Sequence, residues 1–170
     1  MKKIVVLFTF LIISVINLQS QDMKLPQAND NSLFKSIAGT WISEPYEIMG
    51  VKWVDEAEFK WILNNQFLEM EVITKGDNGF NFKSFGILSV DEDGNYKSWG
   101  FDEWGPISVS YSEGKVEGNK IKSTGGSQFM KSSTEIVIDG NVTTEVFNYT
   151  VKDEQGKETP ATLNLIYHKK

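Results

Sequence analysis

Turn-forming residues divide most of the chain into short segments. Their regular spacing restricts the possible fold more than any other feature of the sequence. Clusters of Gly, Asp and Asn, such as those at 76–79, 91–94 and 139–141, recur about every 8 to 18 residues. These residue types tolerate the positive φ that tight hairpins require. No amphipathic helical pattern of useful length separates the clusters. The pattern therefore predicts an all-β, antiparallel fold built from hairpins.

Ten segments between the turns have the composition and spacing of strands. They are 38–43, 51–62, 66–74, 80–90, 96–101, 107–112, 115–122, 128–139, 142–151 and 161–168. Further turns are expected at 64–65, 112–114, 125–126 and 153–156. No internal repeat or second domain is visible. We therefore expect one domain over 33–170, folded as a single antiparallel β-barrel of about eight to ten strands.

Side-chain alternation indicates which faces of the strands are apolar. Trp53, Phe59 and Trp61 fall on one face of their segment, and Glu56 falls on the other. A sheet with one apolar and one polar face fits a barrel in water. The segment 142–151 carries both polar and apolar side chains on each face, which predicts a partly polar lumen.

The N-terminus has the pattern of a secretory signal. Two lysines precede a nearly continuous apolar run over 4–16, and a small residue, Ser20, marks the expected cleavage site. The run is shorter than the roughly 20 residues that span a bilayer. We therefore expect 1–20 to be a signal peptide and 21–32 a flexible leader. An uncleaved N-terminal anchor is the alternative. Cleavage predicts an exported protein, periplasmic or secreted, with no membrane span in the mature chain.

Composition excludes several classes of function. All 23 acidic residues follow the expected cleavage site and two of the 17 basic residues precede it, so the mature net charge is −8. The chain contains no arginine, which argues against nucleic acid as a partner and against a bidentate anion clamp. It also contains no cysteine. Disulfides, thiolate metal sites and a cysteine nucleophile are therefore excluded.

A short motif after the expected first helical turn connects the chain to a known family. Gly39-Thr40-Trp41 stands at the start of the first strand and resembles the lipocalin signature. The resemblance implies that Gly39 lets the chain turn tightly and that Trp41 plugs the closed end of the barrel. Lipocalins commonly stack an arginine from the last strand on this tryptophan. This chain offers only Lys169 or Lys170 as a weaker cation–π partner.

The resemblance extends to a bacterial family of exported, lipocalin-like domains of unknown function within the calycin superfamily. The stretches that carry it are 58–68, 85–91, 96–105 and 114–118. They contain a tight Asn-Asn turn, a strand ending in aspartate, and an aromatic strand ending in Phe-Asp-x-x-Gly. The last part of the chain matches only as further strands.

The aromatic residues are numerous for one domain and suggest a lined pocket. The residues assigned to ligand binding are Trp53, Trp61, Met70, Phe85, Trp99, Phe101, Asp102 and Tyr111. Of these, Trp61, Met70, Trp99 and Tyr111 are expected to face the lumen. The alternative is a filled aromatic core, with Asp102 serving only to cap a turn.

No catalytic residue, metal ligand or cofactor is assigned. The single histidine, His168, invites comparison with the nitrobindins, a similar heme-binding barrel family with a histidine ligand near the C-terminus. However, the inward face of the last strand is expected to carry Leu163, Leu165 and Tyr167, which turns His168 outward. Glu69 and Glu71 could form a catalytic pair of carboxylates, but they are expected on the solvent face of a strand. The segment 91–95 is expected to be a hairpin turn rather than a calcium loop.

These features predict an exported, non-enzymatic carrier or sensor that binds a small hydrophobic molecule. Two alternatives remain open. One is an enzyme that modifies lipids in the lumen, which a buried carboxylate with a raised pKa would support. The other is an interaction or envelope module whose barrel is filled and holds no ligand.

Overall fold

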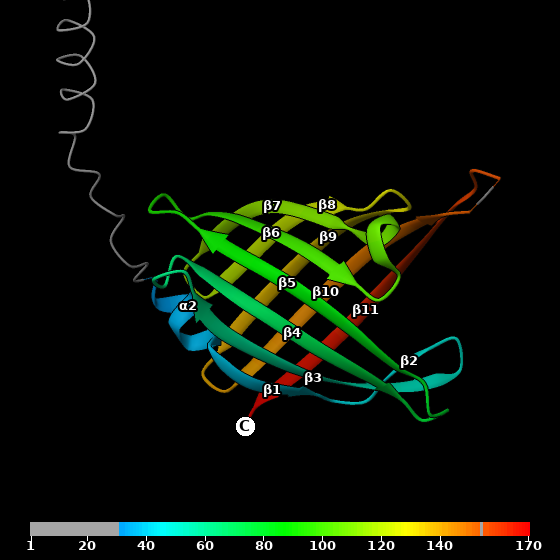
Figure 1. Cartoon of the computed structure of the whole chain (residues 1–170), viewed down its shortest axis with the longest axis horizontal. Coiled ribbons are helices and arrows are strands. Elements are labelled where there is room, and N and C mark those ends of the chain that lie inside the picture. Colours follow the sequence, from blue (N-terminus) through cyan, green and yellow to red (C-terminus); the bar gives the residue numbers. More distant parts are fainter. Residues whose placement is uncertain (1–30, 154) are drawn as a thin grey trace, which may run out of the picture.

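The computed structural model describes residues 31–153 and 155–170, which form an all-β molecule (Figure 1). The predicted signal peptide and all but the end of the predicted leader lie outside the described residues. The elements in chain order are α2 (Ser32–Ile37), β1 (Gly39–Ser43), β2 (Tyr46–Ile48), β3 (Val51–Ile62), β4 (Phe67–Gly76), β5 (Asn81–Val90), β6 (Asn95–Asp102), the 3-10 helix η1 (Gly105–Ser108), β7 (Ser110–Glu117), β8 (Lys120–Gly126), β9 (Met130–Asp139), β10 (Val142–Lys152) and β11 (Glu158–Lys169). No helix among these residues is long and apolar enough to cross a membrane.

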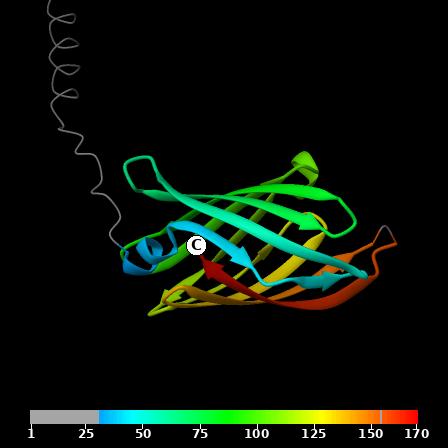
Figure 2. The same cartoon turned by 90° about the horizontal axis from the view of Figure 1, so that it is seen from below.

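The strands close into an antiparallel barrel, as the sequence predicted. Consecutive strands pair from β3 to β11, and β1 pairs with both β3 and β11. β1 and β2 pair with successive parts of β3, through Gly39↔Phe59 and Tyr46↔Trp53. They are therefore two pieces of one barrel strand, and the barrel has ten strands. Figure 2 shows β1 and β11 meeting where the barrel closes.

Helix α2 covers one end of the barrel (Figure 1). The side chain of Asn31 caps it by accepting hydrogen bonds from the backbone N–H groups of Leu33 and Phe34. The side chain of Phe34 is fully buried, and its ring lies 6.3 Å from Trp61 and 6.4 Å from Tyr96. The helix begins at Ser32, inside the segment predicted as leader.

Gly39 and Trp41 lie at this closed end. Gly39 has φ 121°, a conformation that strains any residue with a Cβ. Trp41 is 2% exposed and donates its indole N–H to the carbonyl of Ile37 at 2.7 Å. The ammonium of Lys169 lies 5.4 Å from the centre of the Trp41 ring and donates to the Ser36 carbonyl at 2.7 Å. The sequence offered Lys169 or Lys170 as the cation–π partner of Trp41, and the structure shows that it is Lys169.

Several local predictions were wrong, among them the turn at 125–126, which lies in β8 (Lys120–Gly126). A turn was expected at 112–114, but β7 continues through it and turns at Gly118 instead. Gly114 serves close approach rather than a turn, because a Cβ there would clash with the backbone of Lys122 on β8. The short strand β2 was not predicted. The segment 107–112, predicted as a strand, begins inside η1.

The contact between Lys169 and Trp41 yields a stability prediction. Lys169→Met keeps the aliphatic stem but removes the charge and the hydrogen bond to Ser36, and should lower the free energy of unfolding by about 1 to 2 kcal/mol. Urea denaturation followed by tryptophan fluorescence measures it. Lys170→Met is the control, because the ammonium of Lys170 pairs with Glu56 at the surface and lies away from Trp41. Equal effects of the two substitutions would show that the contact with Trp41 adds no stability.

Candidate functional site

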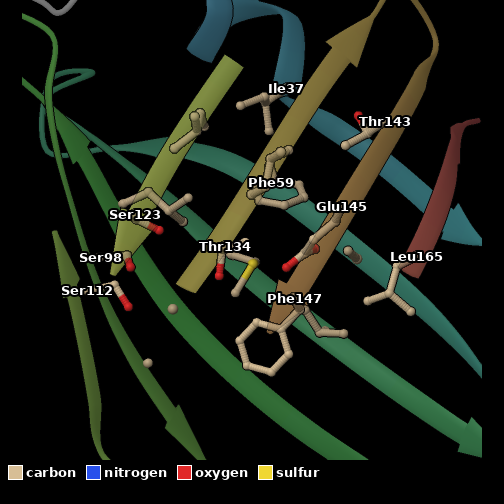
Figure 3. A pocket seen from close by; sticks show the side chains of 18 of the residues that line it. Ile37, Phe59, Ser98, Ser112, Ser123, Thr134, Thr143, Glu145, Phe147 and Leu165 are labelled. Atoms are coloured by element: carbon tan, nitrogen blue, oxygen red, sulfur yellow. The ribbon is translucent and has the colours of Figure 1, made fainter. Parts of the chain in front are cut away.

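The barrel encloses a cavity of about 420 Å³ (Figure 3). Side chains from β3, β4 and β5 make one wall apolar. They are Ala57, Phe59, Met70, Val72 and Leu88. Side chains from β6 to β9 make the facing wall rich in hydroxyl groups. They are Ser98, Ser110, Ser112, Ser123 and Thr134. The lumen is therefore amphipathic, which agrees with the mixed pattern of the later strands.

Two glycines keep this space open. Gly86 on β5 and Gly100 on β6 are paired across the sheet and both line the cavity. A Cβ on Gly86 would lie 2.9 Å from the terminal methyl of Met70, and a Cβ on Gly100 would clash with the hydroxyl of Ser110. Larger residues at these positions would move the lining side chains. The pair therefore contributes to the volume of the lumen.

Two carboxylates lie inside the barrel, and the first has a full set of partners. Asp55 is 5% exposed. Its carboxylate accepts hydrogen bonds from the hydroxyls of Tyr46 at 3.0 Å, Thr74 at 2.6 Å and Tyr167 at 3.0 Å. Burial, with the neighbouring carboxylates, raises the pKa of both tyrosines. The tyrosines therefore stay protonated and remain donors to Asp55.

The second carboxylate, Glu145, has no such partners. Its side chain enters the lumen from β10, flanked across the sheet by Ile136 on β9 and Leu165 on β11. Within the described part of the chain, no hydrogen bond or ion pair reaches its carboxylate. Burial, with repulsion from Asp55, raises the pKa of Glu145 from 4.5 to about 7. Glu145 is therefore an unpaired acid in a ligand-sized cavity.

The lumen has no positive charge to balance these acids. Among the described residues that line it, none is lysine or histidine. Lys169 is the basic residue placed at the closed end, where its ammonium is already bound to Ser36. Once ionised, Glu145 therefore has no basic side chain beside it among the described lining residues.

The loops at the end opposite α2 expose apolar side chains. Antiparallel connection places the β2–β3, β4–β5, β6–β7 and β8–β9 loops together at this end (Figure 1). Each presents at least one large apolar side chain to solvent. They are Met49, Phe80, Trp104, Ile107 and Phe129. An apolar rim at this end suits the entry of an apolar molecule.

The structure brings few of the residues predicted for ligand binding to the cavity. Met70 lines it. Trp99 also contacts it, but its neighbours Ser98 and Gly100 point inward, so the Trp99 ring lies on the outer face and its backbone borders the lumen. The ring packs against Tyr111, with centroids 5.7 Å apart. Tyr111 is 39% exposed on the outer face, so its predicted inward orientation was wrong.

The other predicted residues lie outside the main cavity. Phe85 and Phe101 pack against each other across β5 and β6, with ring centroids 6.1 Å apart, beside an outer surface depression. Asp102 accepts hydrogen bonds from the backbone of Trp104 and the hydroxyl of Ser108. It thus holds the β6–β7 turn, the alternative that the sequence left open.

Trp61 and Trp53 lie at opposite ends of β3. Trp61 packs against Phe34 below the helix, where it belongs to the closed end rather than to the cavity. Trp53 packs edge-on against Phe80 at the other end, with ring centroids 6.1 Å apart. Neither lines the main cavity.

The histidine is placed as expected on the outside of the barrel. His168 is exposed, and its Nε2 lies 2.9 Å from a carboxylate oxygen of Glu44. Leu163, Leu165 and Tyr167 line the lumen, as predicted. No group of three or more potential metal-binding side chains occurs in the described residues. This placement gives no support to an iron ligand at His168.

Sequence reasoning missed Glu145 and Asp55, although a signal existed for the first. On β10, Val142 and Val146 are exposed on the outer face, with Glu145 between them pointing inward. This inverts the usual arrangement of apolar residues inside and acids outside. Asp55 gave a weaker signal, since it shares the face of Trp53 and Ala57. In both strands, the sequence signal for an inward-facing carboxylate is an acid on the face that should be apolar.

Comparison with known proteins supports the fold. A similar structure, described as the crystal structure of Rv2717c from M. tuberculosis, aligns with a TM-score of 0.63 and 15% sequence identity. The alignment covers 85% of this chain and 99% of that one. At this identity the similarity concerns the fold alone. No family model matches the sequence, and a search of curated proteins finds no match.

The raised pKa of Glu145 predicts a pH dependence of stability. A carboxyl whose pKa is higher in the folded state keeps its proton longer there, so the free energy of unfolding falls as pH rises from about 4.5 to about 7 and then levels. The expected loss is up to about 3 kcal/mol. Tyr46 and Tyr167 stay protonated in both states over this range, so they do not contribute.

Glu145→Gln should remove this loss and be the more stable protein at about pH 8. Urea denaturation at several pH values measures the difference. Glu117→Gln is the control, because Glu117 is exposed on the outside of β7 and its substitution should leave the pH dependence unchanged. A wild-type profile that rises between pH 5 and pH 7 and matches that of Glu145→Gln would contradict the prediction.

Proposed function

We propose that this protein is an exported, lipocalin-like carrier or sensor that binds a small hydrophobic molecule in its barrel. The observation that carries the proposal is the cavity of about 420 Å³ with an apolar wall. Its size falls within the roughly 300 to 1,000 Å³ of small-molecule sites. The covered end and the loop-bordered opposite end suit a container that is entered from one side.

Export rests on the N-terminal sequence. The charged start, the short apolar run and the small residue near position 20 have the order of a secretory signal. A protein without cysteine folds equally well in oxidising and reducing compartments, so the lack of cysteine agrees with either periplasm or medium. N-terminal sequencing of the protein from its own host would locate the cleavage site.

One observation favours a second function, an enzyme acting in the lumen. Glu145 has a pKa raised to about 7, which suits a general acid or base. Thr143 on β10 and Thr134 on β9 add hydroxyl groups to the cavity lining. In a proton-transfer reaction on a bound lipid, Glu145 would be the group that takes up and returns the proton. Turnover of a bound compound by wild type, lost in Glu145→Gln, is the result that would establish it.

The ligand-free module has the least support of the three hypotheses, because a barrel with a filled core would leave no cavity of about 420 Å³. A native mass spectrum of the protein from its own host distinguishes the readings directly. A discrete added mass supports the carrier. A bare chain that stays bare after incubation with lipid extract supports the module.

Blocking the cavity should abolish ligand binding. Ser98 faces the lumen from β6, so Ser98→Phe places a ring where the ligand would lie. Titration with Nile red, a neutral apolar dye, should show saturable binding to wild type and at least roughly tenfold weaker binding to Ser98→Phe.

Lys97→Phe provides the matched control, since Lys97 is the next residue along β6 and is exposed on the outer face. It should bind the dye as wild type does. Circular dichroism confirms that both variants are folded. If Ser98→Phe bound the dye as tightly as Lys97→Phe, the dye would not occupy the lumen.

A further inference from the structure

We propose that the molecule held in the lumen is an organic cation, a small amphipathic amine whose ammonium group binds the carboxylate of Glu145 while its apolar part lies against β3, β4 and β5. This deepens the proposed function, on which it rests, by naming the chemical class of the ligand. Among the described residues that line the lumen, Glu145 is the side chain that can bind a charged group most specifically.

The first support is the contrast between the two acids inside the barrel. Three hydroxyl donors satisfy Asp55, from Tyr46, Thr74 and Tyr167. Glu145 has no donor within the described residues. Buried carboxylates in proteins are normally paired or hydrogen-bonded. An unpaired one that points into a cavity therefore marks the place of a donor that comes with the ligand.

The second support is the sign of the charge. The polar side chains of the described lining are hydroxyls, the carboxylate and the Trp41 indole, which is already bound to Ile37, and none of the lining side chains is basic. An anionic ligand would meet Glu145 and Asp55 without a counter-charge. A neutral apolar ligand would leave Glu145 without a partner. A cation both neutralises the acid and supplies its missing donors.

The third support is the setting of the carboxylate. Ile136 and Leu165 lie opposite Glu145 on the two neighbouring strands, so apolar residues flank it on both sides. A charge-assisted hydrogen bond is stronger in such surroundings than in water. The raised pKa of Glu145 has the same origin, since burial there disfavours the ionised acid until a positive charge arrives. An ammonium group would reverse that shift.

The geometry also accommodates the other hydrogens of an ammonium group. Thr134 and Glu145 point into the same part of the cavity, with Thr143 on the same strand as Glu145 (Figure 3). Hydroxyl oxygens accept as well as donate. Beyond this polar group, Phe59 and Met70 offer an apolar surface to the rest of the molecule.

An inorganic cation fits less well. Calcium requires six to eight oxygen ligands and magnesium requires octahedral coordination. No set of three or more acidic or histidine side chains that could hold a metal lies in the described residues. The carboxylate of Asp55 is already occupied by three donors. An amine needs one carboxylate and an apolar surface, and the lumen provides both.

The test compares three ligands that share one chain and differ in the head group. Octylamine, octanol and octanoate, each below its aggregation concentration, compete with bound Nile red at about pH 8, where Glu145 is ionised. In wild type, octylamine should displace the dye at a concentration at least roughly tenfold lower than octanol, and octanoate should be the weakest competitor.

Two variants assign the preference to one residue. Glu145→Gln has nearly the same shape and should bind octylamine and octanol within about threefold of each other. Glu117→Gln removes the same charge from the outer surface and should keep the wild-type preference. If Glu145→Gln does not fold, wild type provides the same test. Its affinity for octylamine should fall as the pH is lowered from about 8 to about 5.5, whereas its affinity for octanol should not change.

The outcomes separate the two proposals. Equal competition by the three compounds in wild type, or a preference for octylamine that survives in Glu145→Gln, would overturn the assignment of an amine and leave the carrier function intact. If neither the dye nor any of the three compounds binds, the carrier function itself is wrong. A preference that Glu117→Gln also loses would indicate attraction to the acidic surface, which again overturns the amine site.

Discussion

Closure of a ten-stranded sheet is the constraint on which the rest of the structure depends. β1 pairs with β3 on one side and with β11 on the other, so the sheet closes on itself. About eight strands give an interior that side chains can fill. Two more strands widen the interior. Small lining residues, among them Gly86, Gly100 and Ser98, leave the added space open.

The closed end shows how the chain secures this barrel without disulfides. The helix brings Phe34 over the end, and Trp41 donates its indole N–H to the last turn of that helix. Lys169, near the C-terminus, reaches over the indole ring to the carbonyl of Ser36. One contact thus joins the first strand, the last strand and the helix. The positive φ of Gly39 lets the chain turn from the helix into β1.

Much of the fold could be read from the sequence because turns and alternation are local signals. The bounds predicted for β3 are those of the structure, Val51–Ile62, because both of its ends are marked by turns. The lumen could not be read in the same way. Pattern reasoning placed Trp99 inside, but its neighbours Ser98 and Gly100 on β6 face inward and the Trp99 ring faces outward. Strand alternation alone does not say which face of a wide barrel is inside.

The residues that were hardest to predict are those that oppose folding most directly. An acid between Ile136 and Leu165 disfavours the folded state once it is ionised, and a valine there would not. Local rules are most often broken at functional sites, where another interaction compensates. Asp55 breaks the same rule but is compensated within the chain by three hydroxyl groups. Glu145 has no such partner among the described residues, which is the physical reason for looking to the ligand.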